Sequence, residues 1–438
     1  MQQKISKFNG LFSILINIVP FLLFPALITQ QGDLFTNILP FAIYYAFRRS
    51  ALILFRDWEH QPRQLGWIGL ISGAIGYGCG IFGQLSPLFF DFAGVGAGIA
   101  STLYPTAINQ GKRLAKQRLK KAATSTSQGS TGKLIYLLSV IILLGVIGYF
   151  KIAILNFTLM LITTILALIG YSATPFKITR PAKLHWFNYG LGLLLLFAML
   201  LIRVGRSRGI GQPVTWGIIL LAVFLIIMVA LLAINWRFKK PLPSGLRLRS
   251  MLYGVCAQYW TLYSTVFIGA VYGIKLYYLV IVAYLCAILF GGLTAKLAYH
   301  YLPFSQWYIN ISMIAIGILM TFWLPTYFVG IFLIRSFASR EQTNTIDLYE
   351  QTTKNYNSSY LTNYYYSTAA GLVSQLVMWG SLLFLAKNSG LNRVLSAFAL
   401  KTVTSQESNA INLTHLILAC YMLLFIICSL VFSKQKRV

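Results

Sequence analysis

Three stretches of the chain are apolar over the length that a helix needs to cross a lipid bilayer. They lie at 134–150, 214–236 and 413–432, with almost no charged residue inside them. A transmembrane helix takes about 20 mainly apolar residues. Only 10% of the 438 residues are charged, whereas soluble domains carry about 25%. Because so few charges cannot cover a water-exposed surface of this size, we predict an integral membrane protein with many spans.

The apolar runs predict an all-α polytopic protein with about fourteen transmembrane helices. The predicted spans lie near 9–30, 34–50, 66–84, 88–110, 134–151, 154–175, 186–203, 214–236, 251–272, 276–297, 304–322, 324–337, 361–386 and 413–433. Their spacing divides them into six, two and six. We therefore predict an N-terminal six-helix bundle over 1–180, a two-helix spacer over 181–245 and a C-terminal six-helix bundle over 246–438.

The basic residues predict the orientation of these spans. With the N-terminus inside, 28 of the 36 Lys and Arg residues fall in inner segments and 8 in outer ones. Cytoplasmic loops carry the excess of positive charge, so both termini are expected in the cytoplasm. The formal net charge of +28 then reflects topology and contact with anionic membrane lipids, and we expect no nucleic-acid partner. The compact loops favour a multi-pass protein of a plasma membrane, which we expect to be bacterial.

Two long polar inner loops are predicted at matching places in the two bundles. They lie at 111–133 and 339–360, each after the fourth span of its bundle. The first half of the loop at 111–133 is basic, and it can continue the fourth helix into the cytoplasm. Duplicated bundles with a substrate site between them are the usual plan of secondary transporters.

The stretch DFAGVGAGIASTLYP at 91–105 admits two interpretations. A glycine-rich turn can bind a dinucleotide phosphate, but that turn follows a strand in a soluble unit and has an acid about twenty residues on. Here a predicted span precedes the glycines, and no Asp or Glu follows before Glu341. Small residues spaced along a transmembrane helix let two backbones approach closely. We therefore predict that Gly94, Gly96 and Gly98 pack helices, with Pro105 as a helix-packing or gating position.

This stretch also resembles the glycine-rich fourth helix of the major facilitator superfamily, with matches at Gly94, Gly96, Gly98 and Pro105. Phe90 stands where many drug–proton antiporters of that superfamily carry an arginine. A second motif, GGLTAK at 291–296, resembles the loop signature between the second and third helices of a bundle. Gly291, Leu293 and Lys296 match that signature, and Ala295 stands in place of its acid.

Six, two and six spans resemble the fourteen-helix drug–proton antiporter branch of this superfamily. The resemblance covers the whole chain as architecture and about twenty residues as motif. It implies two bundles that rock about a central substrate site, with Gly291 and Lys296 at a helix-packing or gating position.

Acidic residues near spans are the candidates for proton coupling, because an ionisable group in a membrane is costly and is usually functional. Asp33 and Asp91 lie at the outer ends of the second and fourth spans. The alternative is that each is an acid at a helix N-terminus, where it interacts favourably with the helix dipole.

Arg48 and Arg49 follow one apolar run directly and precede another. They are candidates to face a central cavity and bind an anionic substrate group. The alternative is that both anchor the helix by extending toward the inner headgroups.

Polar and aromatic side chains mark the ninth span as a cavity-lining helix. Gln258, Tyr259 and Tyr263 fall inside it, and such residues face protein or water rather than lipid. Gln375 is expected to contribute from a facing helix. The remaining tyrosine clusters fit an aromatic belt at the membrane interface.

The five cysteines and four histidines are scattered along the chain. The cysteines have no spacing typical of disulfides or metal ligands, and they fit buried small apolar positions. We therefore predict no metal site, no cofactor and no catalytic residues.

The function expected from these features is secondary active transport, as an exporter of the efflux type, by alternating access between two bundles. The substrate is an unknown small molecule or a lipid-linked one, with proton coupling, and membrane lipids are the other partners. One alternative is a flippase for a lipid-linked anionic glycan. A membrane-embedded glycan polymerase or glycosyltransferase and a non-transporting scaffold are further alternatives, but we do not expect an enzyme because no long outer loop is predicted.

Overall fold

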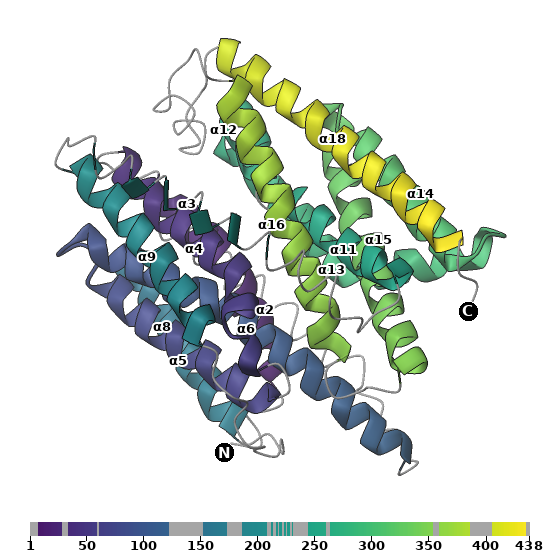
Figure 1. The fold of residues 1–438 in the computed structure, drawn as a ribbon, viewed down its shortest axis with the longest axis horizontal. Helices are drawn as coiled ribbons and strands as arrows, with labels where there is room; N and C mark the ends of the chain where they lie inside the picture. The colour runs from purple at the N-terminus through teal and green to yellow at the C-terminus, as the bar shows by residue number, and fades with distance from the viewer. Residues whose placement is uncertain are drawn as a thin grey trace. The chain divides into compact units, whose positions relative to one another are not determined.

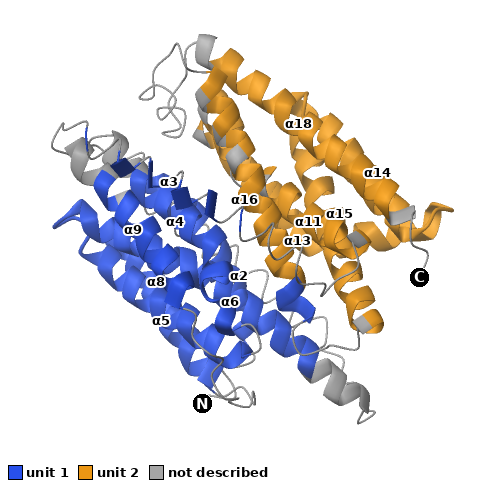
Figure 2. Cartoon of the chain, in the orientation of Figure 1, with its two compact units in different colours: residues 1–231, 356–362 blue, residues 232–355, 363–438 orange. Residues whose placement is uncertain are grey.

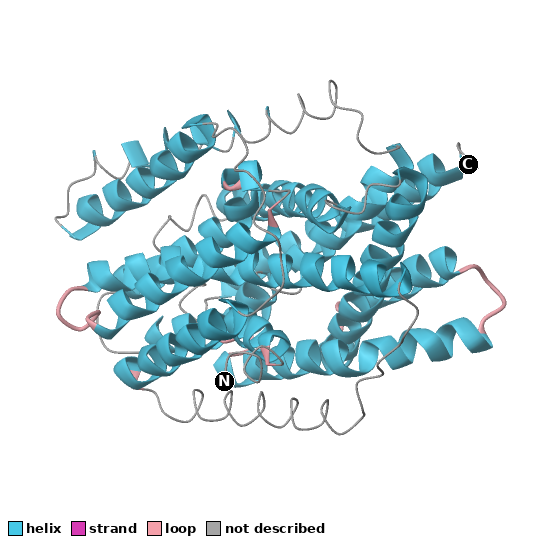
Figure 3. Cartoon of the chain, turned by 90° about the horizontal axis from the view of Figure 1, so that it is seen from below, coloured by secondary structure: helices cyan, strands magenta, loops and turns pink. Residues whose placement is uncertain are grey.

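The structure of the chain is a computed structural model, and nearly all of the residues that it describes lie in helices (Figure 1). It describes residues 8–28, 34–58, 61–121, 152–172, 186–207, 244–259, 263–353, 359–385 and 405–434, with single residues between 212 and 230. These ranges contain no strand (Figure 3). The all-α prediction is confirmed.

The helices are those of a polytopic membrane protein. Four of those described are long and apolar enough to cross a membrane, at Asn9–Leu27, Ala153–Ser172, Lys275–Tyr301 and Ser408–Phe432. Twelve of the fourteen predicted spans coincide with described helices. The spans predicted at 134–151 and 214–236 fall outside the described residues, apart from isolated positions in the second.

The chain divides into two compact units (Figure 2). Unit 1 holds Met1–Leu231 and Tyr356–Thr362, and unit 2 holds Leu232–Asn355 and Asn363–Val438. The division into two six-helix bundles and a spacer stays a prediction.

In unit 1 proline residues set several helix starts, because proline suits the first turn, where its missing N–H group has no partner to lose. Pro20, Pro62 and Pro87 are such positions. The helices are α2 (Asn9–Ile18), α3 (Pro20–Ile28), α4 (Leu34–Leu54), α5 (Pro62–Ile81), α6 (Pro87–Lys121), α8 (Ala153–Ser172) and α9 (Trp186–Ser207), with a 3₁₀ turn η1 (Arg56–Trp58). Helix α6 packs against α2, α4 and α5, α5 also packs against α8, and α9 packs against α4.

The glycines of α6 lie where its backbone approaches two neighbouring helices. A Cβ atom on Gly94 would lie 2.5 Å from the Pro40 carbonyl oxygen of α4. A Cβ on Gly96 would lie 2.6 Å from the Cα of Gly76 in α5. Without a hydrophobic driving force between helices in lipid, such close packing is a main source of association. Pro105 lies within α6, which continues past it to Lys121.

We expect Gly98→Ala to lower the stability of unit 1. The new Cβ would lie 2.6 Å from the Tyr44 carbonyl oxygen and 2.9 Å from the Arg48 backbone nitrogen, so α4 would have to move. The expected loss is about 1–3 kcal/mol, measured as thermal unfolding in detergent. Gly78→Ala on α5 is the matched control, because nothing lies within 4 Å of its new Cβ. Equal unfolding temperatures for the two variants would contradict this prediction.

Unit 2 is organised around α15, which packs against α11, α13 and α14. Its helices are α11 (Ser244–Gln258), α12 (Ser264–Val271), α13 (Ile274–Tyr301), α14 (Gln306–Met320), α15 (Leu324–Thr353), α16 (Ser359–Leu385) and α18 (Ser405–Lys434). Helix α18 packs against α11, α12 and α14. Helices α11 and α16 meet where a Cβ on Gly254 would clash with the Ser367 carbonyl oxygen.

Several predicted boundaries need correction. The inner loop predicted at 339–360 is helical as far as Thr353, because α15 runs 16 residues past the predicted end of its span. The loop signature GGLTAK lies inside α13, which continues to Tyr301. There Gly291 packs against Ser336 of α15 and Lys296 is exposed. The fourth helix continues through Lys121, which confirms its predicted extension.

Candidate functional site

Arg48 lies within α4 and is directed at α2. Its Nη1 donates to the Tyr44 hydroxyl at 2.6 Å and to the Asn17 carbonyl oxygen at 3.0 Å. Its Nη2 donates to Asn17 Oδ1 at 2.6 Å, and the guanidinium carbon lies 4.6 Å from the centre of the Phe21 ring. Helix α4 runs on to Leu54, beyond the predicted end at 50. These contacts hold the cation among side chains of unit 1.

The remaining charged candidates of unit 1 are buried in the same set of helices. Arg49 is 9% exposed and Asp91 is 2% exposed. Asp91 was predicted as a proton-coupling candidate, and the alternative was an acid at a helix N-terminus. The alternative is not supported, because α6 begins four residues earlier, at Pro87, and has no acid in its first turn. The role in proton coupling stays a prediction. Helices α4 and α6 are joined by the Thr102 hydroxyl, which donates to the Arg48 carbonyl oxygen at 2.6 Å. Asp33 lies outside the described residues.

A polar cluster in unit 2 joins three helical segments around His415. We call Tyr259, Thr321 and His415 the histidine triad. The Tyr259 hydroxyl lies 2.7 Å from Thr321 Oγ1 and 3.0 Å from His415 Nε2. Thr321 Oγ1 lies 3.2 Å from the same ring nitrogen. All three side chains are buried, so a polar group at this place is satisfied by protein partners rather than by bulk water.

The triad lies where the first helix of unit 2 changes its hydrogen-bond pattern. Helix α11 ends at Gln258 and α12 begins at Ser264, with π-helical geometry at Tyr259 and at Tyr263. The Ser264 hydroxyl donates to the Tyr259 carbonyl oxygen, five residues back, at 3.3 Å. Such π-turns inside α-helices are frequent at functional sites.

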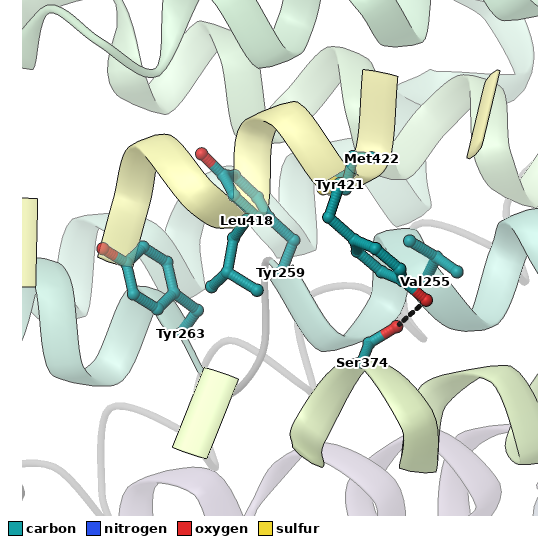
Figure 4. A pocket seen from close by; sticks show the side chains of 7 residues that line it. All are labelled: Val255, Tyr259, Tyr263, Ser374, Leu418, Tyr421 and Met422. Carbon is teal, nitrogen blue, oxygen red and sulfur yellow. Dashed lines mark hydrogen bonds between the residues drawn. The ribbon is translucent and has the colours of Figure 1, made fainter. Parts of the chain in front are cut away.

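A small cavity of about 10 Å³ lies beside the triad, between α11, α16 and α18 (Figure 4). It is lined by Val255, Tyr259, Tyr263, Ser374, Leu418, Tyr421 and Met422. Tyr421 points toward Ser374, and their hydroxyl groups lie 3.4 Å apart. This volume is close to the minimum that holds one water molecule, so the cavity as described is too small for an organic substrate.

A second polar cluster of unit 2 surrounds Glu341. The Arg249 Nη2 and Nε atoms lie 2.6 Å and 2.7 Å from Glu341 Oε1. Asn310 Nδ2 donates to Glu341 Oε2 at 2.8 Å, and Tyr299 donates to Asn310 Oδ1 at 2.6 Å. The Arg249 guanidinium lies 4.2 Å from the centre of the Trp307 ring. The cluster thus joins α11, α13, α14 and α15.

Glu341 lies four residues past the span predicted at 324–337, and its carboxyl is only 1% exposed. Burial raises the pKa of this carboxyl above its ordinary value, while Arg249, Asn310 and Thr345 lower it in part. The acid is therefore a buried group whose charge depends on its arginine partner.

The structure brings together only some of the predicted cavity residues. Tyr259 and Tyr263 are buried and border the same cavity. Gln258 ends α11, and its side chain is not among those described. On α16, Gln375 Oε1 is shielded from solvent and has no hydrogen-bond partner among the described residues. No described group of three or more His, Cys, Asp or Glu residues could hold a metal ion.

The two ionisable residues at the centres of the unit 2 clusters, His415 and Glu341, were not predicted as site residues from the sequence. His415 stands near the start of an apolar span, and a single ionisable residue there is by itself a signal of function. Glu341 was assigned to a loop because the sequence turns polar after Ser336. A helical face shared by Glu341 and Thr345, four residues apart, was the available signal.

The sequence matches no protein-family model and no curated protein. Solved structures do match along the whole chain. A POT family transporter in complex with 5-aminolevulinic acid has a TM-score of 0.56 at 16% identity, over 98% of this chain and 96% of that one. A second POT family structure, in complex with a thioalcohol-conjugated peptide, also has a TM-score of 0.56, at 15% identity over the same shares. A structure described for substrate recognition in proton-dependent oligopeptide transporters has a TM-score of 0.52 at 12% identity, over 100% of both chains.

This chain has the fold of the POT transporters. The POT structures have the major facilitator fold, so the fold implied by the resemblance is confirmed, and membership of this chain in that superfamily stays a prediction. The drug–proton antiporter branch that the sequence suggested is not confirmed, since these neighbours are described as POT or proton-dependent oligopeptide transporters. The solved structures that share the fold of this polytopic membrane protein are those of transporters.

Proposed function

We propose that this chain is a secondary active transporter of the plasma membrane that moves a small polar molecule by alternating access between two helical bundles. The observation that carries this proposal is the likeness to POT transporters over at least 96% of both chains in the first two comparisons. Buried ionisable groups within apolar helices, such as Asp91 and His415, support it, because such groups usually serve transport or proton transfer.

The proposed substrate is a small molecule that carries a carboxylate. Two neighbours were solved with 5-aminolevulinic acid and with a conjugated peptide. In this chain Arg48 and Arg49 lie within the helices of unit 1, and guanidinium groups suit carboxylates. A lipid-linked glycan, a membrane-embedded glycan-processing enzyme and a scaffold find no comparable support.

The proposal predicts gradient-driven movement of such a molecule by purified protein in proteoliposomes. An imposed pH gradient is expected to drive accumulation of dialanine or 5-aminolevulinic acid and not of a drug-like cation such as ethidium. Export was the direction expected from sequence, and the POT neighbours lend it no support, so substrate is loaded inside in one series and outside in another. Protein-free liposomes are the control.

Asp91→Asn and Asp33→Asn variants test the proton-coupling candidates in the same assay. We expect Asp91→Asn to abolish accumulation against the gradient while leaving exchange of labelled for unlabelled substrate. If folded protein moves neither zwitterion in either direction, the proposed function is wrong.

A further inference from the structure

His415 is an ionisable residue within an apolar helix. It lies on α18 inside the candidate span Ser408–Phe432 and is 2% exposed. Placing an ionisable group there costs free energy, and such groups are retained where ions or protons move. The contacts of the His415 ring determine where it can bind a proton.

The hydrogen bonds of the triad determine which ring nitrogen carries the proton. The Thr321 hydroxyl donates its single proton to the Ile318 carbonyl oxygen at 2.6 Å, so Thr321 Oγ1 is an acceptor toward Tyr259 and His415. The short 2.7 Å contact between Tyr259 and Thr321 then requires the Tyr259 hydroxyl as donor. The Tyr259 oxygen is left to accept, at 3.0 Å, from His415 Nε2. The network therefore assigns the neutral ring a proton on Nε2.

The second ring nitrogen, Nδ1, then carries the free lone pair. Its one described hydrogen-bonding neighbour is the Tyr259 hydroxyl oxygen, at 3.4 Å. A neutral imidazole has one donor and one acceptor nitrogen, and protonation turns the acceptor into a donor. An added proton at Nδ1 leaves the Nε2 bond to the triad in place, so the ring can take up a proton without breaking the cluster.

Aromatic rings surround His415 and can hold a positive imidazole. Phe267 of α12 stacks on it with ring centres 4.3 Å apart, and Phe322 meets it edge to face at 4.8 Å. The titratable groups that face it are Tyr259, Tyr263 and Tyr327, the last two with ring centres 5.5 Å and 6.5 Å away. No carboxylate or cation is among its described contacts. Ring faces attract a cation most strongly when water is excluded.

A space with room for about one water molecule lies next to the triad. The cavity of about 10 Å³ is lined by Tyr259 and Tyr263, two residues that also contact His415. Its volume is enough for one water molecule, which also needs polar partners. The exposed lining of the cavity is mainly apolar, so the tyrosine and serine hydroxyl groups at its edge are the groups that could bind that water.

We propose that His415 is a proton-binding site of unit 2, which takes up the coupling proton on Nδ1 while Nε2–H stays bonded to Tyr259. That this proton is coupled to substrate movement rests on the proposed transport function. That His415 binds a proton does not depend on that function. A hydronium ion gives its proton to the Nδ1 lone pair and becomes a neutral water molecule, and the neutral imidazole becomes imidazolium. Release reverses the step, and no other bond changes.

The direct test observes the ring itself. The variant with His60→Gln, His185→Gln and His300→Gln leaves His415 as the single histidine, and its ¹⁵N-labelled imidazole is followed by NMR in lipid nanodiscs. At high pH we expect one neutral ring with the proton on Nε2. On acidification we expect a reversible step to a doubly protonated ring in folded protein. A ring that stays neutral until the protein unfolds, or one with its neutral proton on Nδ1, would overturn the proposal.

A transport assay separates this inference from the proposed function. His415→Gln keeps an amide N–H for the triad and cannot take up a proton. We expect it to lose gradient-driven accumulation and to keep substrate exchange. His300→Gln, at an exposed position near the end of α13, is the matched control and is expected to behave like the parent.

The two experiments fail in different ways. If His415 takes up a proton but the parent moves no substrate, the transport function is wrong and the proton site stands. If the parent transports and His415→Gln keeps full gradient dependence, the proton site is wrong and the transport function stands.

Discussion

Arg249→Met is expected to destabilise unit 2 by about 3–5 kcal/mol, because removal of one partner from a buried ion pair leaves the other charge uncompensated. Two nitrogen atoms of Arg249 lie within 2.7 Å of Glu341 Oε1. Asn310 and Thr345 donate to the same carboxylate, but neither neutralises its charge. Methionine fills a similar volume beside Trp307 and carries no charge, so the loss reports the ion pair rather than a cavity.

The same variant should depend on pH with a defined sign. Burial already raises the pKa of Glu341, and Arg249 is the first of the groups that lower it. Without Arg249 the folded-state pKa rises further above that of the unfolded chain. A carboxyl with a raised folded-state pKa favours folding when protonated, and this contribution is lost as pH rises through the folded-state value. The defect of Arg249→Met should therefore be larger at pH 8 than at pH 5.

The double variant Arg249→Met with Glu341→Gln is the control. It removes both charges and keeps an amide that Asn310 can contact, so much of the lost stability should return. Thermal unfolding of the parent, the single variant and the double variant is measured in detergent at pH 5 and pH 8. A double variant that unfolds as early as the single one would contradict the account of an uncompensated charge.

Arg48→Lys is expected to cost about 2–3 kcal/mol although it keeps the charge, because a lysine ammonium does not reproduce the planar fork of the guanidinium. Arg48 donates to Tyr44, to the Asn17 backbone and to the Asn17 side chain. It also lies over the Phe21 ring. A lysine can hold some of these acceptors but not the same arrangement, so α2 and α4 lose part of their connection.

Lys296→Arg is the matched control, because it exchanges the same two residue types in the opposite direction at an exposed position on α13. A conservative change there should alter the free energy of unfolding by less than about 0.5 kcal/mol. The thermal unfolding of both variants in detergent is compared with that of the parent. If Arg48→Lys melts with the parent, the guanidinium geometry does not hold α2 to α4.

The sequence predicted the helices better than it predicted where they end. Apolar length finds a span because lipid cannot solvate backbone polar groups, and the glycine pattern of α6 indicated where backbones meet. Hydropathy falls after Ser336, yet α15 continues because Glu341 and Thr345 are buried against neighbouring helices. The start of α6 was predicted within one residue, at 88 against Pro87, and the alternative that Asp91 is a helix N-terminal acid is not supported because Asp91 lies past the first turn.

The candidate site depends on contacts between residues far apart in the chain. His415 and Tyr259 are separated by 156 positions, and Arg249 and Glu341 by 92. A single sequence contains no signal for such a pairing beyond the residue types themselves. Tyr259 and Tyr263 were found because a polar pair inside an apolar helix is conspicuous. Their partners were not found. Threonine is common in apolar helices, and His415, although an ionisable residue in a span, gives no sign in the sequence that it pairs with Tyr259.

The change of pattern between α11 and α12 has a mechanical consequence. Arg249 of the glutamate cluster lies on α11, before this change, and Phe267, which stacks on His415, lies on α12, after it. The glutamate cluster and the histidine triad are therefore not connected by one uninterrupted α-helix. One uninterrupted helix would transmit a displacement along its axis from one cluster to the other. Two helices that meet at a change of hydrogen-bond pattern need not move as one body, and Tyr259, which bonds His415, is the residue at which the α-helical pattern of α11 changes.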